Sequence, residues 1–191
     1  MSRGRLEAFS DGVIAILITI MVLELRIPEG DSLESLRAVL PEFLVYVLSF
    51  VNLGIYWNNH HHLLHTVSSV NGRILWANLH LLFWLSLVPV TTAWMGHTHL
   101  AVLPAATYGV VLIFAAVGYF ILVNTIIATH GPHSALATAV GRDVKGKLSI
   151  VIYFVAILLA FVSPIVAVAL YATVELMWLV PDRRIERSTR S

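Results

Sequence analysis

The 191-residue chain contains no cysteine and very little charge. Without cysteine it can form neither a disulfide framework nor a site that depends on a thiolate ligand or nucleophile. Only 12% of its residues are charged, whereas 58% are hydrophobic, and this balance lies outside the range of soluble globular domains. The formal net charge is only +1 at pH 7, so the overall charge gives no reason to expect an acidic partner.

Motifs of enzymes and nucleotide-binding proteins are missing as well. The chain has no phosphate-binding glycine loop, no Gly-x-Ser-x-Gly elbow and no His-Glu-x-x-His sequence. The Thr-Val-Gly-Tyr-Gly filter sequence of ordinary potassium channels is also absent. We therefore predict no enzymatic activity and no cofactor.

Long apolar stretches dominate what is present. They lie at about residues 8–25, 41–57, 74–95, 100–127 and 148–180, and a membrane-spanning helix needs about 20 such residues. The last stretch is too long for one helix and contains Pro164, a residue suited to begin a new helix. The sequence thus predicts an all-α, polytopic membrane protein with six transmembrane helices in a single domain over residues 1–191. The expected helices are approximately 5–26, 38–60, 73–95, 100–128, 145–162 and 164–181.

The basic residues predict how these helices are oriented. If the N-terminus is inside, ten of the 12 Lys and Arg residues fall in inner segments, and only Arg26 and Arg37 fall outside. The inner residues are Arg3, Arg5, Arg73, Arg142, Lys145, Lys147, Arg183, Arg184, Arg187 and Arg190. Such asymmetry requires an even number of spans and places both termini in the cytoplasm. Because topology explains the basic residues, we expect no nucleic-acid partner.

The first expected helix carries two different faces. Its charged start, Arg5 to Asp11, leads directly into an apolar run. At about 100° per residue, one face is aliphatic apart from a single threonine; it consists of Gly12, Ile16, Thr19, Ile20 and Leu23. Ser10 and Asp11 lie well round the helix, and Glu7 lies opposite Ile16. We expect the polar face to point into protein, and the aliphatic face to meet lipid, another helix or a pore.

Polar residues of three expected helices share one depth, near the inner surface. They are Ser10, Asp11, His60, His61, His62 and Asn78. Because unpaired polar groups are costly inside a membrane, we predict that they form one hydrogen-bond network, with Asp11 and one of the three histidines at its core. The network either only fixes the first helix or also titrates to control function.

The same histidines allow a metal site to be considered. His61 and His65 are four residues apart, as two ligands on one helical face would be. No acidic residue or cysteine stands beside them, so a third ligand would have to come from elsewhere in the chain. We therefore expect no bound metal. A membrane metalloenzyme centred on residues 60–65 is kept as an alternative function.

The pattern Arg5-x-x-x-Phe9-Ser10-Asp11 resembles the signature of the endolysosomal potassium channel family and its bacterial homologues, which lack the usual filter loop. The resemblance extends to the helix count, the His-rich end of the second helix and the Pro-Asp-Arg-Arg sequence that starts at Pro181. It implies a potassium-preferring cation channel in the inner membrane of a bacterium. Potassium and other monovalent cations would be its permeant ions.

The resemblance also implies how such a channel is built. One six-helix unit per chain implies a homotetramer, in which the first helix of each subunit lines a central pore. The family's narrow point corresponds to Ile16, and its further pore positions correspond to Thr19, Ile20 and Leu23. The alternative from another class is a small proton-coupled secondary transporter that uses Asp11 and the histidines of the second helix as a proton relay.

Overall fold

The computed structural model describes residues 2–132, 134–140 and 143–179, and every regular element within them is an α-helix. The all-α fold class is therefore confirmed for this part of the chain. In chain order the helices are α1 (Arg3–Leu23), α2 (Leu33–His65), α3 (Gly72–Ser86), α4 (Val88–His97), α5 (Val102–His130), α6 (Ala135–Val140), α7 (Val144–Ala160) and α8 (Pro164–Leu179).

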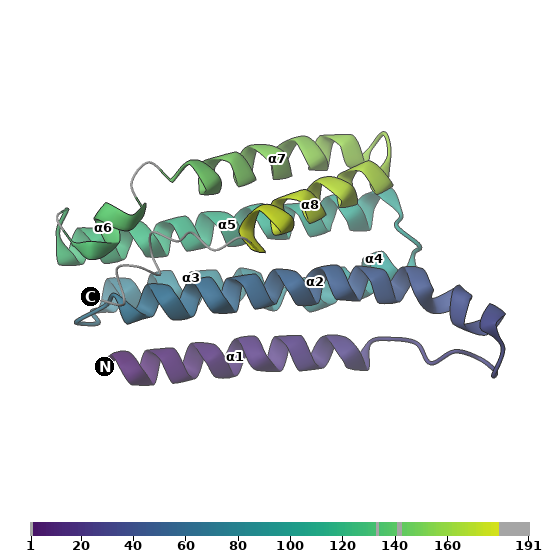
Figure 1. Ribbon diagram of the computed structural model, residues 1–191, viewed down its shortest axis with the longest axis horizontal. Coiled ribbons are helices and arrows are strands. Elements are labelled where there is room, and N and C mark those ends of the chain that lie inside the picture. The colour runs from purple at the N-terminus through teal and green to yellow at the C-terminus, as the bar shows by residue number, and fades with distance from the viewer. Residues whose placement is uncertain (1, 133, 141–142, 180–191) are drawn as a thin grey trace.

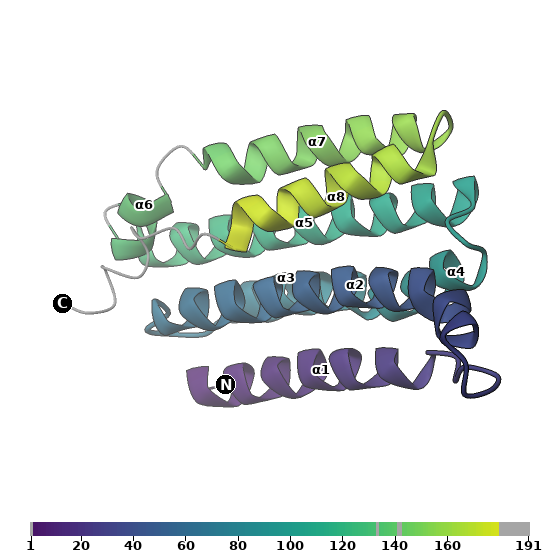
Figure 2. The ribbon, with the colours of Figure 1, turned by 45° about the vertical axis from the view of Figure 1, so that its right-hand side comes forward.

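The long helices lie side by side in an elongated bundle (Figure 1). α1 runs along one side of the bundle and α7 along the opposite side, and the view turned by 45° keeps this order (Figure 2). α1 packs on α2, α3 and α4, whereas α5 packs on α3, α4, α7 and α8. The neighbours of α1 therefore cover only one of its sides.

In the part of the chain that the structure describes, four helical segments are long and apolar enough to cross a membrane. They are α1, α2, the combined segment Gly72–His97 and α5, and each exceeds the roughly 20 residues that a span requires. α7 and α8 are shorter, with 17 and 16 residues. α8 begins at Pro164, the residue at which we divided the last apolar stretch. The chain is thus a multi-pass membrane protein.

One expected span is interrupted within its length. The region predicted as a single helix over 73–95 contains two helices, α3 and α4, which meet at Leu87. Pro89 has no N–H with which to continue the hydrogen-bond ladder, and its ring crowds the preceding turn. It sits in the first turn of α4 instead, where proline is tolerated.

Other helix boundaries also differ from the prediction. α2 begins at Leu33 rather than at residue 38, because the Ser32 hydroxyl accepts the backbone N–H of Ser35 at 3.1 Å and caps the helix. Its first turns, before Pro41, point away from the rest of the helix (Figure 1). α1 ends at Leu23, three residues early, and the short α6 was not predicted. The Pro-Asp-Arg-Arg sequence that starts at Pro181, and Arg142, lie outside the described residues.

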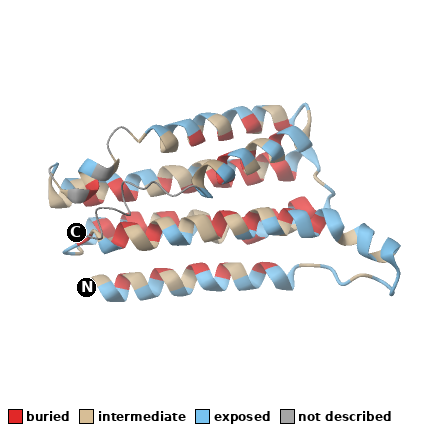
Figure 3. Cartoon of the chain, viewed as in Figure 1, coloured by how far each residue is buried: buried red, intermediate tan, exposed pale blue. Residues whose placement is uncertain are grey.

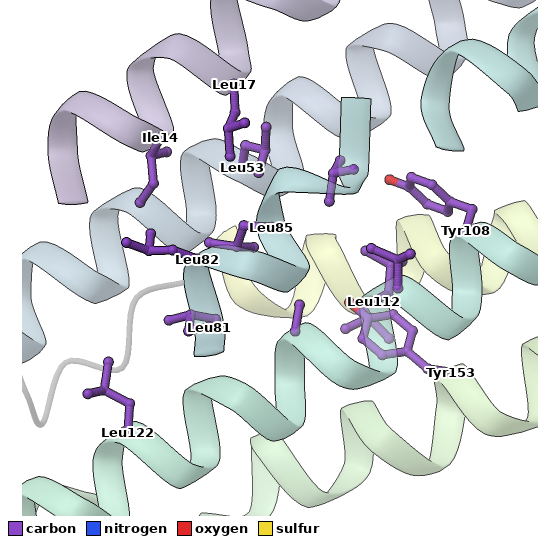
Figure 4. Packing of buried hydrophobic residues seen from close by; sticks show 14 of the residues in the cluster. Ile14, Leu17, Leu53, Leu81, Leu82, Leu85, Tyr108, Leu112, Leu122 and Tyr153 are labelled. Carbon is purple, nitrogen blue, oxygen red and sulfur yellow. The ribbon is translucent and has the colours of Figure 1, made fainter. Parts of the chain in front are cut away.

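Buried side chains face the middle of the bundle from both sides. The burial colouring shows the buried residues of α1 on the side toward α2 and the exposed ones on the outer side (Figure 3). Ile14 and Leu17 of α1 point toward Leu53 of α2 and toward Leu82 and Leu85 of α3 (Figure 4), and none of the five is more than 8% exposed. Because lipid tails are as apolar as leucine, close packing rather than exclusion of water stabilises such contacts.

A close approach between α5 and the last two helices depends on Gly109. A Cβ at this position would overlap the hydroxyl of Tyr171 and lie 2.7 Å from Cγ1 of Ile157. Tyr171 cannot easily move, because it is fully buried and donates its hydroxyl to the Ala105 carbonyl at 3.1 Å. Because residue 109 has no side chain, α8 can pack closely against α5.

We expect Gly109→Ala to lower the free energy of unfolding by about 1–3 kcal/mol, the usual cost of overpacking. Denaturant titration in detergent measures this change. Gly54→Ala in α2 is the matched control, since a Cβ there meets no atom within 4 Å. Equal stability of the two variants would contradict the assigned packing of α5 on α8.

Candidate functional site

α1 divides into a buried face and an exposed face. Its buried residues recur every three or four positions, as the helical repeat requires for one face; they are Leu6, Ser10, Ile14, Leu17 and Met21. The covering helices α2, α3 and α4 supply the surface on which this face packs.

The exposed face of α1 carries the four predicted pore residues. Ile16 is 57% exposed, Ile20 is 41% exposed and Leu23 is 79% exposed. Thr19 is exposed too, and its hydroxyl donates to the Ile16 carbonyl at 2.9 Å. Within the described residues nothing covers this apolar surface.

The buried face holds a chain of three polar side chains. Asn78 of α3 donates from Nδ2 to Ser10 Oγ at 3.0 Å, and Ser10 in turn donates to the Leu6 carbonyl at 2.9 Å. Asn78 Oδ1 therefore accepts, at 2.6 Å, from Nε2 of His60 in α2. The structure thus brings together three of the predicted network residues, one from each of α1, α2 and α3, with Asn78 at the centre. Ser10, His60 and Asn78 are all 0% exposed.

Within the described residues Asp11 makes no hydrogen bond or ion pair with His60, His61 or His62, so that part of the predicted network is wrong. Its carboxylate accepts the indole N–H of Trp57 at 3.1 Å. Trp57 lies three residues before His60, about one helical turn along α2. The sequence alone could not distinguish Trp57 from a histidine as the partner of Asp11, because either side chain of α2 can donate a hydrogen bond to the carboxylate.

A second polar cluster joins the start of α1 to the end of α2. Glu7 Oε1 lies 3.1 Å from Nδ1 of His61 and 3.3 Å from Nε2 of His65. Arg3 donates to the carbonyl oxygen of His65 at 3.2 Å and to its Nδ1 at 3.1 Å. The three ligand atoms of Glu7, His61 and His65 lie within 4.8 Å of one another and form a group that could hold a metal ion.

Glu7 and Arg3 are partners of the histidines that the sequence alone does not predict. The available signal was that Glu7 lies opposite Ile16 on the helix, and so must face protein if Ile16 faces away from it. Spacing along the chain gave no sign of it, because 54 residues separate Glu7 from His61.

Three of the predicted signature and network residues make no hydrogen bond or ion pair with either cluster in the described part of the chain. Arg5 is exposed, and Phe9 is 49% exposed, on the same side of α1 as Ile16. The ring of His62 lies edge-on to His61, with centroids 5.7 Å apart. Within the described residues no hydrogen bond or ion pair holds Arg5.

The opposite end of the bundle holds an ion pair that the sequence did not predict. Glu42 is 4% exposed and receives the backbone N–H of Arg26 at 2.9 Å and its Nε at 2.7 Å. His97 approaches the same carboxylate at 3.5 Å. These contacts tie the α1–α2 connection to α2 and α4, and so fix where α1 ends.

Comparison with known proteins finds one family. The model of the family described as the endosomal/lysosomal potassium channel TMEM175 matches residues 5–89. A potassium channel of Chryseobacterium sp. (strain P1-3) is 56% identical over 190 residues, which cover 100% of this chain and 99% of that protein.

A solved structure and an animal protein are also similar. The crystal structure of a lysosomal potassium-selective channel TMEM175 homolog from Chamaesiphon minutus matches with a TM-score of 0.80 at 26% identity. That match covers 94% of this chain and 97% of the other. The Homo sapiens endosomal/lysosomal proton channel TMEM175 is 37% identical over 75 residues, which cover 33% of this chain and 15% of that protein.

Proposed function

The chain belongs to the TMEM175 family and is a potassium channel, and from this premise we propose that α1 of four identical subunits lines its central pore. The observation that carries the proposal is the exposed aliphatic face of α1, from Ile16 to Leu23. The described part of a single subunit gives this face no partner, whereas four copies around an axis would turn it toward a shared pathway.

We place the narrow segment of that pathway at Ile16. A ring of isoleucine side chains contains no group that replaces the hydration shell of an ion. Such a constriction would discriminate by size and by the cost of dehydration, and would close by dewetting. Thr19, Ile20 and Leu23 would line the pore beyond the constriction. The partners of Arg5 and Phe9, exposed on the same side, would then come from neighbouring subunits.

Six spans and cytoplasmic termini complete the proposed topology in the inner membrane of a bacterium. The 17 residues of α7 meet the lower limit of about 17 residues for a span. α8 runs back toward the end of the bundle where α1 begins (Figure 1). An even number of spans agrees with the cytoplasmic excess of Lys and Arg.

The proton-coupled transporter gains no support from the site. Its relay needs Asp11 and the histidines in contact, but Asp11 is bonded to Trp57. An indole N–H is a donor only and cannot accept a proton to pass it on. The buried chain through Ser10, Asn78 and His60 ends at the Leu6 carbonyl.

Single-channel recording of the purified protein in lipid bilayers tests the proposal. We expect discrete unitary currents whose reversal potential, under opposed potassium and sodium gradients, follows potassium. Because the animal relatives are named proton channels, a proton gradient belongs in the same recording. Transport without unitary currents would favour the transporter instead.

We predict a tetramer in mild detergent. One α1 per subunit cannot enclose a pathway, and closed cyclic symmetry is the usual way in which identical subunits do so. Light scattering with correction for bound detergent gives the protein mass. A monomeric or dimeric mass for protein that retains potassium currents would refute the proposed pore.

A further inference from the structure

We infer that Glu7, His61 and His65 form a binding site for a divalent transition-metal ion that links the start of α1 to the end of α2. Glu7 lies on the face of α1 opposite to the proposed pore face. The site is therefore separate from the proposed permeation pathway and is formed within one subunit.

The distances match a metal site before any metal is bound. A tetrahedral zinc site with bonds of about 2.0–2.1 Å places neighbouring ligand atoms about 3.3 Å apart. Oε1 of Glu7 lies 3.1 Å from Nδ1 of His61 and 3.3 Å from Nε2 of His65. Two edges of the tetrahedron are thus already in place, and the third pair of ligand atoms lies within 4.8 Å.

The two imidazoles are held in position by their own helix and its neighbours. His61 and His65 are four residues apart on α2, and their ring centroids lie 4.5 Å apart at an interplanar angle of 66°. The ring of Trp57 stacks on His61 from one turn earlier, with centroids 6.2 Å apart. Such support reduces the side-chain ordering that a metal would otherwise impose.

An unsatisfied atom points to a missing partner. Nδ1 of His61 is buried and lacks a hydrogen bond of acceptable geometry within the described residues, although a carboxylate oxygen lies 3.1 Å away. Buried polar atoms without a partner are uncommon and call for an explanation. A metal ion between this nitrogen and Glu7 would satisfy both atoms.

The chemistry of the ligands selects the class of metal. Two imidazoles and one carboxylate suit zinc and its neighbours in the first transition row, whereas calcium and magnesium prefer oxygen ligands alone. The histidine side chains are 38% and 40% exposed, so water can reach the fourth coordination position. Zn²⁺ and the spectroscopic probe Co²⁺ are therefore the ions to test.

Arg3 competes with the metal for this position. Its guanidinium donates to Nδ1 of His65, and its Nε lies 3.9 Å from Oε2 of Glu7. A neutral imidazole that binds metal through Nε2 carries its proton on Nδ1, so the bond from Arg3 must break. Removing this cation should tighten metal binding.

The first experiment measures binding to the purified full chain, without any current. Calorimetric titration with Zn²⁺ should give one ion per subunit, and Co²⁺ should develop the strong visible absorption of a tetrahedral site. Glu7→Gln, His61→Ala and His65→Ala should each weaken Zn²⁺ binding by about tenfold or more. Loss of a residue that only supports a metal ligand already costs about tenfold, and these three residues are the proposed ligands themselves. Arg3→Gln should strengthen it.

His62→Ala is the matched control, because it removes an adjacent histidine that lies outside the three-ligand group. It should bind Zn²⁺ as the unmodified protein does. Melting temperatures without metal verify that each variant is folded, and added Zn²⁺ should raise the melting temperature of the unmodified protein but not of Glu7→Gln. Unchanged binding in Glu7→Gln, or loss of binding in His62→Ala, would overturn the site.

A consequence for gating rests on the proposed pore. An ion that holds Glu7 to α2 would restrain α1 and so reduce potassium current, and Glu7→Gln should remove the part of Zn²⁺ inhibition that this site causes. Binding without any effect on current would refute the gating role and leave the site intact. Absence of potassium current in metal-free protein would instead count against the proposed function.

Discussion

Ile16→Ala is expected to raise potassium conductance and to reduce the preference for potassium over sodium. Four copies of this side chain would meet at the axis, and shortening each one widens the constriction and lowers the dehydration barrier for every cation. Ile16→Asn and Ile16→Cys should also ease permeation, by supplying a polar or smaller lining. Single-channel conductance and reversal potentials in mixed potassium and sodium solutions measure both effects.

Ile14→Ala and Ile18→Ala are the matched controls on the same helix. Ile14 is fully buried and Ile18 partly buried, so each truncation removes packing inside the subunit. We expect Ile14→Ala to cost about 2–5 kcal/mol of stability, as other buried Ile→Ala changes do, with little effect on ion preference. If the controls shift the reversal potential and Ile16→Ala does not, the pore face has been placed on the wrong side of α1.

Asn78→Ala is expected to destabilise the subunit strongly. The amide of Asn78 is the link between Ser10 and His60, and its removal leaves the imidazole without its partner in a fully buried position. A stranded buried group costs about 1–3 kcal/mol, and the cavity left by the side chain adds to this cost. Denaturant titration and the yield of tetramer measure the loss.

Asn58→Ala is the control, because it makes the same chemical change at an exposed position of α2. It should change stability little.

Ser10→Ala and Asp11→Asn should damage assembly or opening more than ion preference, because both residues bond to neighbouring helices rather than facing the pore side. A well-assembled Asp11→Asn channel with normal conductance but altered selectivity would show that α1 is rotated from its assigned orientation.

Composition and helical periodicity are enough to establish the fold class and the two faces of α1. Apolar runs of about 20 residues can satisfy their backbone groups in lipid only as helices, so composition settles the all-α class without any tertiary information. The helical repeat then separates Ile16, Thr19, Ile20 and Leu23 from Ser10. Since a buried polar residue must face protein, the polar face of α1 was expected to point inward, and the structure leaves the opposite, aliphatic face exposed.

Which polar groups meet depends on how the helices pack against one another. Asp11 could have met Trp57 or a histidine, and Glu7 had no visible partner, because the alignment of α1 on α2 sets each pairing. The pair of Arg26 and Glu42 at the other end depends equally on how the connecting loop returns. Periodicity assigns a residue to a face of its helix, but the position of one helix along another is fixed by the packing of both, and that packing is not a local property of either sequence.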